Sequence, residues 1–165
     1  MRTTILFFAA LILSFNQVKA QWYIQTTNIP ERLYKIIFAD SINGFAVGEN
    51  GIILKTTNGG NNWLTTTSNT TNLLRSVFFS EITTGYIAGD NGTILKTSSS
   101  GLTWSILNSN TTNRIFSVYF TDTNIGYVVG ENGLILKTVD GGINWNVQNI
   151  NTLTSLYSLI FTDTN

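Results

Sequence analysis

Four tryptophans recur at a fixed interval along this chain of 165 residues. Each lies 41 residues after the one before it, and the residues between them keep the same register without a gap. A fixed period of this size indicates a repeat architecture, in which each unit buries its apolar face only by stacking on its neighbours. The tryptophans are Trp22, Trp63, Trp104 and Trp145.

Each repeat carries the pattern of four short β-strands. An Asn-Gly dipeptide joins two apolar runs in each unit, at 50–51, 91–92 and 132–133, and it is the strongest short signal for a hairpin. In the first unit, strands are expected at about residues 34–39, 44–48, 52–57 and 63–67. Four strands in about 40 residues are typical of a propeller blade, so the sequence predicts an all-β chain, a β-propeller of four-stranded blades. A β-solenoid and an open antiparallel sheet are the alternatives, and no helix is expected after residue 21.

The period also predicts the blade boundaries. Each tryptophan opens the outermost strand of its blade, so residues 22–27 form an outer strand that would complete the last blade of a closed ring and remove an exposed sheet edge. Propellers hold about four to eight blades, so residues 21–165 are expected to be an N-terminal fragment of about three and a half blades. A short chain that closes by oligomerising is the alternative. Blades are expected at about residues 33–67, 74–108 and 115–149, with a partial blade from 156.

Residues 1–20 have the features of a secretory signal peptide. Arg2 precedes an apolar segment at residues 5–13 that is too short to span a membrane, and small residues flank Lys19 before a cleavage point after Ala20. We therefore predict a secreted, periplasmic or cell-surface protein with no stable membrane insertion. An uncleaved membrane anchor is the alternative.

Composition restricts the chemistry of the remaining chain. Without Arg2 and Lys19, seven of the nine basic residues remain against nine acidic ones, which offers no basic surface for nucleic acid. The chain has no histidine and no cysteine, which excludes His-based catalysis and His/Cys metal sites. Calcium needs roughly six to eight converging oxygens, whereas Glu49, Asp90 and Glu131 bring one carboxylate each to the Asn-Gly turns. We predict no cofactor, no metal and no catalytic residue.

Two residue columns on the strands are expected to have structural roles. Phe45, Tyr86 and Tyr127 follow a glycine at one register and are expected to pack in the core between blades. The second column, on the third strands, is expected to lie on a solvated strand face, with a cationic binding rim as the alternative. It consists of Lys55, Lys96 and Lys137.

A second motif precedes the last three tryptophans. It resembles the Asp-box of bacterial-neuraminidase-type repeats, S/T-x-D-x-G-x-T-W, although only Asp140 keeps the aspartate and Asn58 and Ser99 stand at the other two positions. The short polar side chain is expected to cap a turn, the glycine to occupy a strained backbone position, and the tryptophan to pack between sheets. The motif therefore supports the propeller rather than a reaction. Its glycines are Gly60, Gly101 and Gly142.

The whole unit, F-x-D-x-x-x-G-[FY]-x-x-G-[ED]-N-G-x-I-L-K-T-x-x-G-G-x-x-W, resembles the repeat of the photosystem II stability/assembly factor family of plants and cyanobacteria. The resemblance covers nearly all of residues 22–165. It implies a seven-bladed propeller that acts as an assembly chaperone and binds a reaction-centre protein, with an arginine-rich patch associated with that binding. The candidates here are Arg32 and Arg114, each ten residues after a tryptophan, and Arg75, twelve after one.

Three functions follow as hypotheses. The first is a secreted, non-catalytic binding or scaffolding module that contacts a protein or glycan through its loops and the channel rim. The second is a sialidase-like glycosidase, which would need three arginines for a substrate carboxylate, a tyrosine nucleophile and an acid; no tyrosine–glutamate pair can be assigned from spacing. The third is a glycan-binding module without catalysis.

Overall fold

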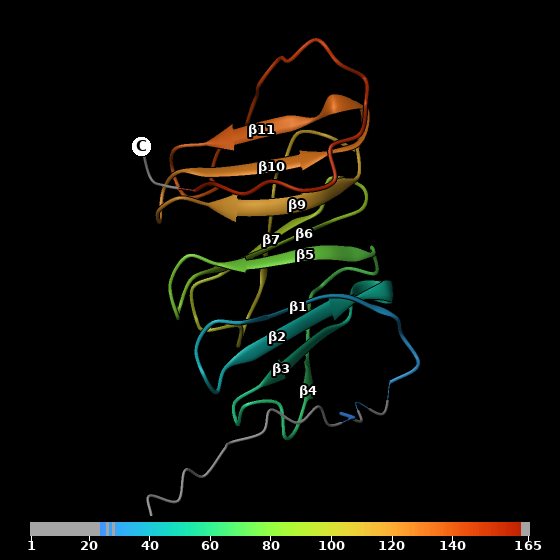
Figure 1. The fold of residues 1–165 in the computed structure, drawn as a ribbon, viewed down its shortest axis with the longest axis vertical. Coiled ribbons are helices and arrows are strands. Elements are labelled where there is room, and N and C mark those ends of the chain that lie inside the picture. Colours follow the sequence, from blue (N-terminus) through green and yellow to red (C-terminus); the bar gives the residue numbers. More distant parts are fainter. Residues whose placement is uncertain (1–23, 26, 28, 163–165) are drawn as a thin grey trace, which may run out of the picture.

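The described residues form three antiparallel sheets of four strands each, which confirms the all-β propeller fold class. A computed structural model describes residues 24–25, 27 and 29–162. Within each sheet the strands lie side by side in chain order, and Figure 1 shows the three sheets stacked along the long axis. The signal sequence, Trp22 and part of the strand expected at 22–27 lie outside the described residues. No helix in the described part is long and apolar enough to cross a membrane.

The strand bounds repeat from sheet to sheet, and in the first unit they lie close to the expected ones. The first sheet holds β1 (Leu33–Phe38), β2 (Gly44–Gly48), β3 (Ile53–Thr56) and β4 (Leu64–Thr66). The second holds β5 (Leu74–Phe79), β6 (Gly85–Gly89), β7 (Ile94–Thr97) and β8 (Ser105–Leu107). The third holds β9 (Ile115–Phe120), β10 (Gly126–Gly130), β11 (Ile135–Thr138) and β12 (Asn146–Val147).

The Asn-Gly dipeptides form the turns between second and third strands. In the first sheet Asn50 and Gly51 have φ values of 54° and 69°, and the amide of Ile52 donates to the carbonyl of Glu49 over 3.0 Å. These are the features of a type I′ turn. In the first and third sheets this turn is also a short 3₁₀ helix, η1 (Glu49–Gly51) and η2 (Glu131–Gly133) respectively. The sequence predicted no helix at these positions.

The turns between third and fourth strands use the polar residue of the second motif. In the third sheet Asp140 accepts hydrogen bonds from the Thr138 hydroxyl at 2.8 Å and from the backbone and side-chain amides of Asn144 at 2.9 and 2.8 Å. The Thr138 hydroxyl accepts from the amide of Gly142 at 2.9 Å. Asn58 takes the place of Asp140 in the first sheet, so an amide oxygen is sufficient for this turn.

Three aromatic rings fill the boundary between the first and second sheets. Phe45 from β2 stacks on Phe79 from β5, with ring centroids 4.4 Å apart. Trp104 meets both rings edge-on, at 6.3 and 6.1 Å. Phe45 and Trp104 are buried, so the indole lies between two sheets as the sequence predicted.

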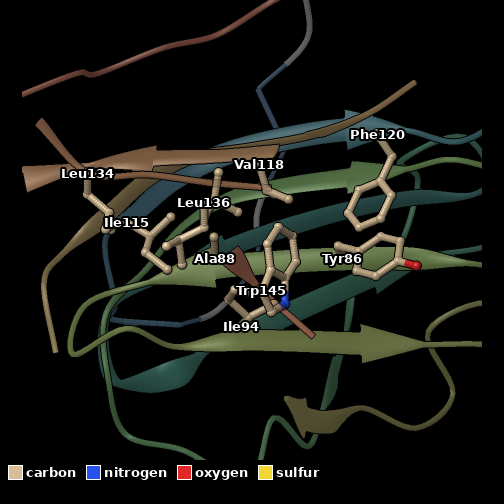
Figure 2. Close-up of a cluster of buried hydrophobic side chains, with 10 residues drawn as sticks. Tyr86, Ala88, Ile94, Ile115, Val118, Phe120, Leu134, Leu136 and Trp145 are labelled. Atoms are coloured by element: carbon tan, nitrogen blue, oxygen red, sulfur yellow. The ribbon is translucent and has the colours of Figure 1, made fainter. Parts of the chain in front are cut away.

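The boundary between the second and third sheets repeats this arrangement (Figure 2). Tyr86 stacks on Phe120 with centroids 3.7 Å apart, and Trp145 meets Phe120 edge-on at 6.0 Å. Burial raises the pKa of Tyr86 to about 12, so its hydroxyl stays neutral and donates to the carbonyl of Gly141 over 3.0 Å. Aliphatic side chains complete this core: Ala88, Ile94, Ile115, Val118, Val128, Leu134 and Leu136.

Trp63 does not have the predicted position between two sheets. It is half-buried, and among the described aromatic rings it meets only that of Phe38 in its own sheet, edge-on at 6.0 Å. Phe38 is 43% exposed, whereas Phe120 at the same register is 3% exposed. The difference arises because no described sheet precedes the first one and supplies a partner ring.

The segment expected to begin a fourth blade forms no strand within residues 151–162. A first strand needs a second strand beside it, and the described residues supply no such strand for this segment. The segment nevertheless lies against the third sheet: the amide of Leu156 donates to Gly130 over 2.9 Å, and the ring of Phe161 lies 4.7 Å from that of Tyr127.

The lysine column is not simply solvated. Lys96 is half-buried, lies 5.4 Å from the Tyr86 ring centroid and donates to the carbonyl of Gly141 over 2.8 Å. The Lys96 ammonium therefore fixes the turn of the next sheet. Lys55 and Lys137 lie over Phe45 and Tyr127 in the same way, at 5.8 and 5.3 Å.

Trp104→Ala should destabilise the protein strongly. The substitution empties the boundary between two sheets and should lower the free energy of unfolding by about 3–5 kcal/mol. Trp63→Ala is the matched control, because its indole is half-buried and should cost less than about 2 kcal/mol. Urea unfolding followed by circular dichroism measures both. Equal losses would contradict the role of the sheet boundary.

Asp140 should make stability depend on pH in the acid range. Hydrogen bonds from the backbone and side chain of Asn144, and from Thr138, lower the pKa of Asp140 from 3.8 to about 2. A pKa lowered by folding stabilises the folded state above the unfolded value and loses that effect as the pH falls through the folded value. Asp140→Asn should therefore make the fall of Tm between about pH 4 and pH 2 shallower.

Thermal unfolding followed by circular dichroism at several pH values gives the comparison. Hydrogen bonds also lower the pKa of Asp40 and Asp122, chiefly from Asn43 and from the Ile125 amide respectively. Some acid sensitivity should therefore remain in the variant. An unchanged slope would show that the Asp140 turn does not contribute.

Candidate binding face

One end of the three sheets gathers the arginines and the acids of the Asn-Gly turns, Glu49, Asp90 and Glu131. The turns between second and third strands, the beginnings of the first strands and the loops that join the sheets all lie at this end, on the right of Figure 1. The first strands also contact one another from sheet to sheet, β1 with β5 and β5 with β9. Residues ten to twelve positions after a tryptophan therefore lie at this end, at or near the beginnings of the first strands β1, β5 and β9.

Arg75 is fixed at the middle of this face. Its guanidinium binds both carboxylate oxygens of Asp90, one of them at 3.0 Å, and the two side chains are only 21% and 23% exposed. The hydrogen bond that Arg75 donates to Asp90 raises the pKa of Arg75. The guanidinium carbon also lies 5.8 Å from the ring centroid of Tyr34 and 5.3 Å from that of Phe116, within reach of a cation–π interaction. Arg75 thus joins three neighbouring sheets.

The rings around Arg75 belong to one register column. Tyr34, Arg75, Phe116 and Tyr157 each lie twelve residues after a tryptophan. Tyr157 stacks on Phe116 with centroids 4.9 Å apart. Tyr34 and Tyr157 are 46% and 72% exposed, so the column ends in accessible tyrosines. We call these four residues the inner column.

Arg32 and Arg114 are exposed and weakly paired. The Arg114 side chain is 56% exposed, and its Nε lies 4.0 Å from the Asp90 carboxylate that Arg75 already occupies. Arg32 is 81% exposed, with its Nε 4.0 Å from Glu49. Surface pairs at this distance contribute little to stability. Both guanidinium groups are therefore available to an anionic ligand, whereas that of Arg75 is not.

The three arginines that the sequence predicted as binding candidates do not form one cluster. The structure brings Arg75 and Arg114 together around Asp90, while Arg32 lies beside Glu49 one sheet away. The sequence favoured an ordinary role in the turns over calcium binding for these acids, and the structure places Glu49 and Asp90 beside arginines. Among the described residues, no group of three or more acidic side chains could hold a metal ion.

Sequence reasoning did not identify the inner column. The signal was present, since its members share the 41-residue period with the tryptophans. The column was missed because a comparison of repeats looks for the same residue type at each position, and Arg75 stands where the other repeats have an aromatic residue. The arrangement offers guanidinium groups for carboxylates and ring faces for planar or apolar side chains.

Comparison with known proteins identifies relatives of the chain. The family model described as photosynthesis system II assembly factor YCF48 matches residues 15–110 and 97–164. None of the curated proteins compared with the chain matches it.

Solved structures share the fold. A structure of YCF48 bound to D1 peptide has a TM-score of 0.71 and 23% identity, and the match covers 80% of this chain and 44% of that one. YCF48 from Cyanidioschyzon merolae has a TM-score of 0.64 and 24% identity over 73% of this chain and 41% of that one. An ancestral GH74 enzyme has a TM-score of 0.60 and 20% identity, covering 73% and 19%. The chain spans less than half the length of these structures.

Arg75→Leu should cost more stability than Arg114→Leu. The first substitution leaves the half-buried Asp90 without its charged partner, which should lower the free energy of unfolding by about 1.5–3 kcal/mol. The second removes an exposed pair worth less than about 1 kcal/mol. Urea unfolding of both variants gives the comparison.

A double-mutant cycle tests the cause. Asp90→Asn combined with Arg75→Leu should cost clearly less than the sum of the two single substitutions, because the two groups interact directly. Additive losses would exclude the Arg75–Asp90 pair as a structural element.

Proposed function

This chain belongs to the photosynthesis system II assembly factor YCF48 family, and we propose that it is a non-catalytic module that binds a peptide segment of a partner protein. The proposal places the peptide at the end of the sheets that holds the arginines. A related YCF48 structure contains a bound D1 peptide, which makes a peptide the ligand class to test first.

The observation that supports the proposal is the exposed guanidinium of Arg114. It lies beside the inner column and shares Asp90 with Arg75, which already occupies both oxygens of that carboxylate. A peptide carboxylate can therefore approach Arg114 without breaking a strong internal pair. Charge-assisted hydrogen bonds to a guanidinium are roughly twice as strong as neutral ones.

The inner column would supply the remaining contacts of the peptide. Tyr157 and Phe116 form an aromatic surface next to Arg114 at the beginning of β9. Aromatic residues and arginine are enriched in the residues that dominate binding energy at protein interfaces. A peptide with a carboxylate and a neighbouring apolar or aromatic side chain has the matching chemistry.

The same contacts argue against the glycosidase alternative. A sialidase-like site would need three arginines free to hold one substrate carboxylate, and Arg75 is engaged by Asp90. The likeness to a GH74 enzyme at 20% identity concerns the fold alone. We further propose that the module acts outside the cytoplasm, on the basis of the signal-peptide pattern in residues 1–20.

Arg114→Gln should weaken peptide binding. Peptides selected from a random display library on the wild-type chain, together with the D1 peptide, provide the ligands for fluorescence anisotropy. The substitution removes one charge-assisted contact and should weaken affinity about tenfold, or about 1.4 kcal/mol. Higher salt should weaken the wild-type complex more than that of the variant.

Lys35→Gln is the matched control, because Lys35 is an exposed cation on β1 at another register. Its affinity should remain close to that of the wild type. Equal weakening in both variants would show only an effect of net charge and would contradict a site at Arg114. Hydrolysis of a fluorogenic sialoside by the wild type would contradict the non-catalytic function.

A further inference from the structure

After the predicted signal peptide, three long segments of the chain carry no charged residue. They lie between Lys55 and Arg75, between Lys96 and Arg114, and between Asp140 and Asp163. The first two contain β4 and β8 with the loops that lead to the next sheet, and the third contains β12 with the equivalent loop. Soluble surfaces normally carry interspersed charges of both signs. A charge-free surface that repeats with every sheet therefore needs a separate explanation.

Each of these segments lines a groove, and the three grooves occupy equivalent places. Each groove lies between the Asn-Gly turn of its sheet and the loop that follows the fourth strand. From the first sheet to the third, the volumes are about 600, 400 and 360 Å³. No lysine, arginine, aspartate or glutamate lines any of the three. Such volumes lie in the range of roughly 300–1,000 Å³ of small-ligand sites.

The groove floors are held in place by internal hydrogen bonds. In the second groove the amide of Gly92 donates to Asn113 over 2.9 Å, and the Ser109 hydroxyl donates to the carbonyl of Gly92 over 2.6 Å. The Asn72 side chain donates to the Thr93 hydroxyl over 2.8 Å. Gly92 has a φ of 65° and packs directly against the carbonyl of Thr111, so no side chain fits there. A preformed groove loses little entropy when a ligand binds.

The groove rims present neutral polar groups to solvent. Asn50, Asn91 and Asn132 are exposed at equivalent turn positions, with φ between 54° and 56°. The amides of Asn50 and Asn132 offer both donors and an acceptor, as sugar hydroxyls require. The Asn91 amide donates one N–H to the Asn72 side chain over 3.0 Å and offers its oxygen and its second N–H. Ile106 and Leu153 add exposed apolar surface to the second and third grooves.

We propose that these grooves bind a neutral glycan, with one short stretch of the glycan in each groove. An ionic ligand would find no counter-charge there, and a purely apolar one would leave the rim amides without partners. A neutral saccharide has hydroxyl groups for the amides and C–H faces for the apolar side chains. Equivalent grooves on successive sheets also suit a repeating polymer, because linked weak sites gain affinity by multivalency. This site is separate from the peptide site at Arg114.

The test replaces three rim amides with carboxylates. The triple variant Asn50→Asp, Asn91→Asp and Asn132→Asp keeps the turn, because Asp-Gly suits a type I′ turn as Asn-Gly does. The control variant, Ser41→Asp, Thr83→Asp and Asn124→Asp, adds the same charge at exposed residues in the turns between first and second strands. Circular dichroism checks that both fold.

Isothermal titration with neutral hexasaccharides of glucose, mannose and xylose, and with their parent polymers, provides the readout. The wild type should bind at least one of them, with affinity that is unchanged by salt because no ionic contact is involved. The groove variant should bind about tenfold more weakly, while the control variant and Arg114→Gln should keep wild-type affinity.

Three results would overturn the proposal. The first is no binding of any neutral saccharide to the wild type at about 10 mM. The second is equal loss in the groove and control variants. The third is loss of peptide binding, and not of saccharide binding, in the groove variant, which would assign the grooves to the protein partner. Failure of Arg114→Gln to affect peptide binding concerns only the other site.

Discussion

The stacking of aromatic rings across each sheet boundary is the interaction on which the rest of the structure depends. One ring comes from the second strand of a sheet, and the next sheet supplies a phenylalanine and a tryptophan. Phe45, Phe79 and Trp104 form the first such group, and Tyr86, Phe120 and Trp145 the second. A four-stranded antiparallel sheet alone has little core, so burial of these rings is what makes the repeated units one folded body.

This packing also determines where the functional groups lie. Because the sheets stack in one orientation, the beginnings of all first strands and all Asn-Gly turns reach the same end of the molecule. An arginine or acid that recurs with the repeat therefore meets its counterparts from neighbouring sheets. Asp90 receives Arg75 from its own sheet and lies 4.0 Å from Arg114 of the next. The Arg114–Asp90 contact therefore arises between repeats, whereas the Arg75–Asp90 pair lies within one.

The binding face has two chemically distinct zones. The inner zone, beside the first strands, holds the arginines, the turn acids and the inner column. The outer zone, beside the fourth strands, has uncharged grooves lined mainly by asparagine, threonine and serine. The separation follows from the position of each residue in the repeat, because no charged residue lies in the fourth strands or in the loops that follow them until Arg75 and Arg114. Two ligand classes can therefore be considered for one face without competition for the same side chains.

The sequence by itself determined the period, the four strands of a unit and the turns, since a 41-residue spacing, apolar alternation and Asn-Gly dipeptides are local properties. It also identified Trp104 and Trp145 as core residues and the arginines as binding candidates. Only the tertiary structure showed that Arg75 is held by Asp90 while Arg114 is exposed. It also showed that Trp63, unlike its equivalents, meets no ring of a preceding sheet among the described residues. Residues in equivalent positions look alike along the chain, but their energies depend on the neighbouring sheet that each one meets.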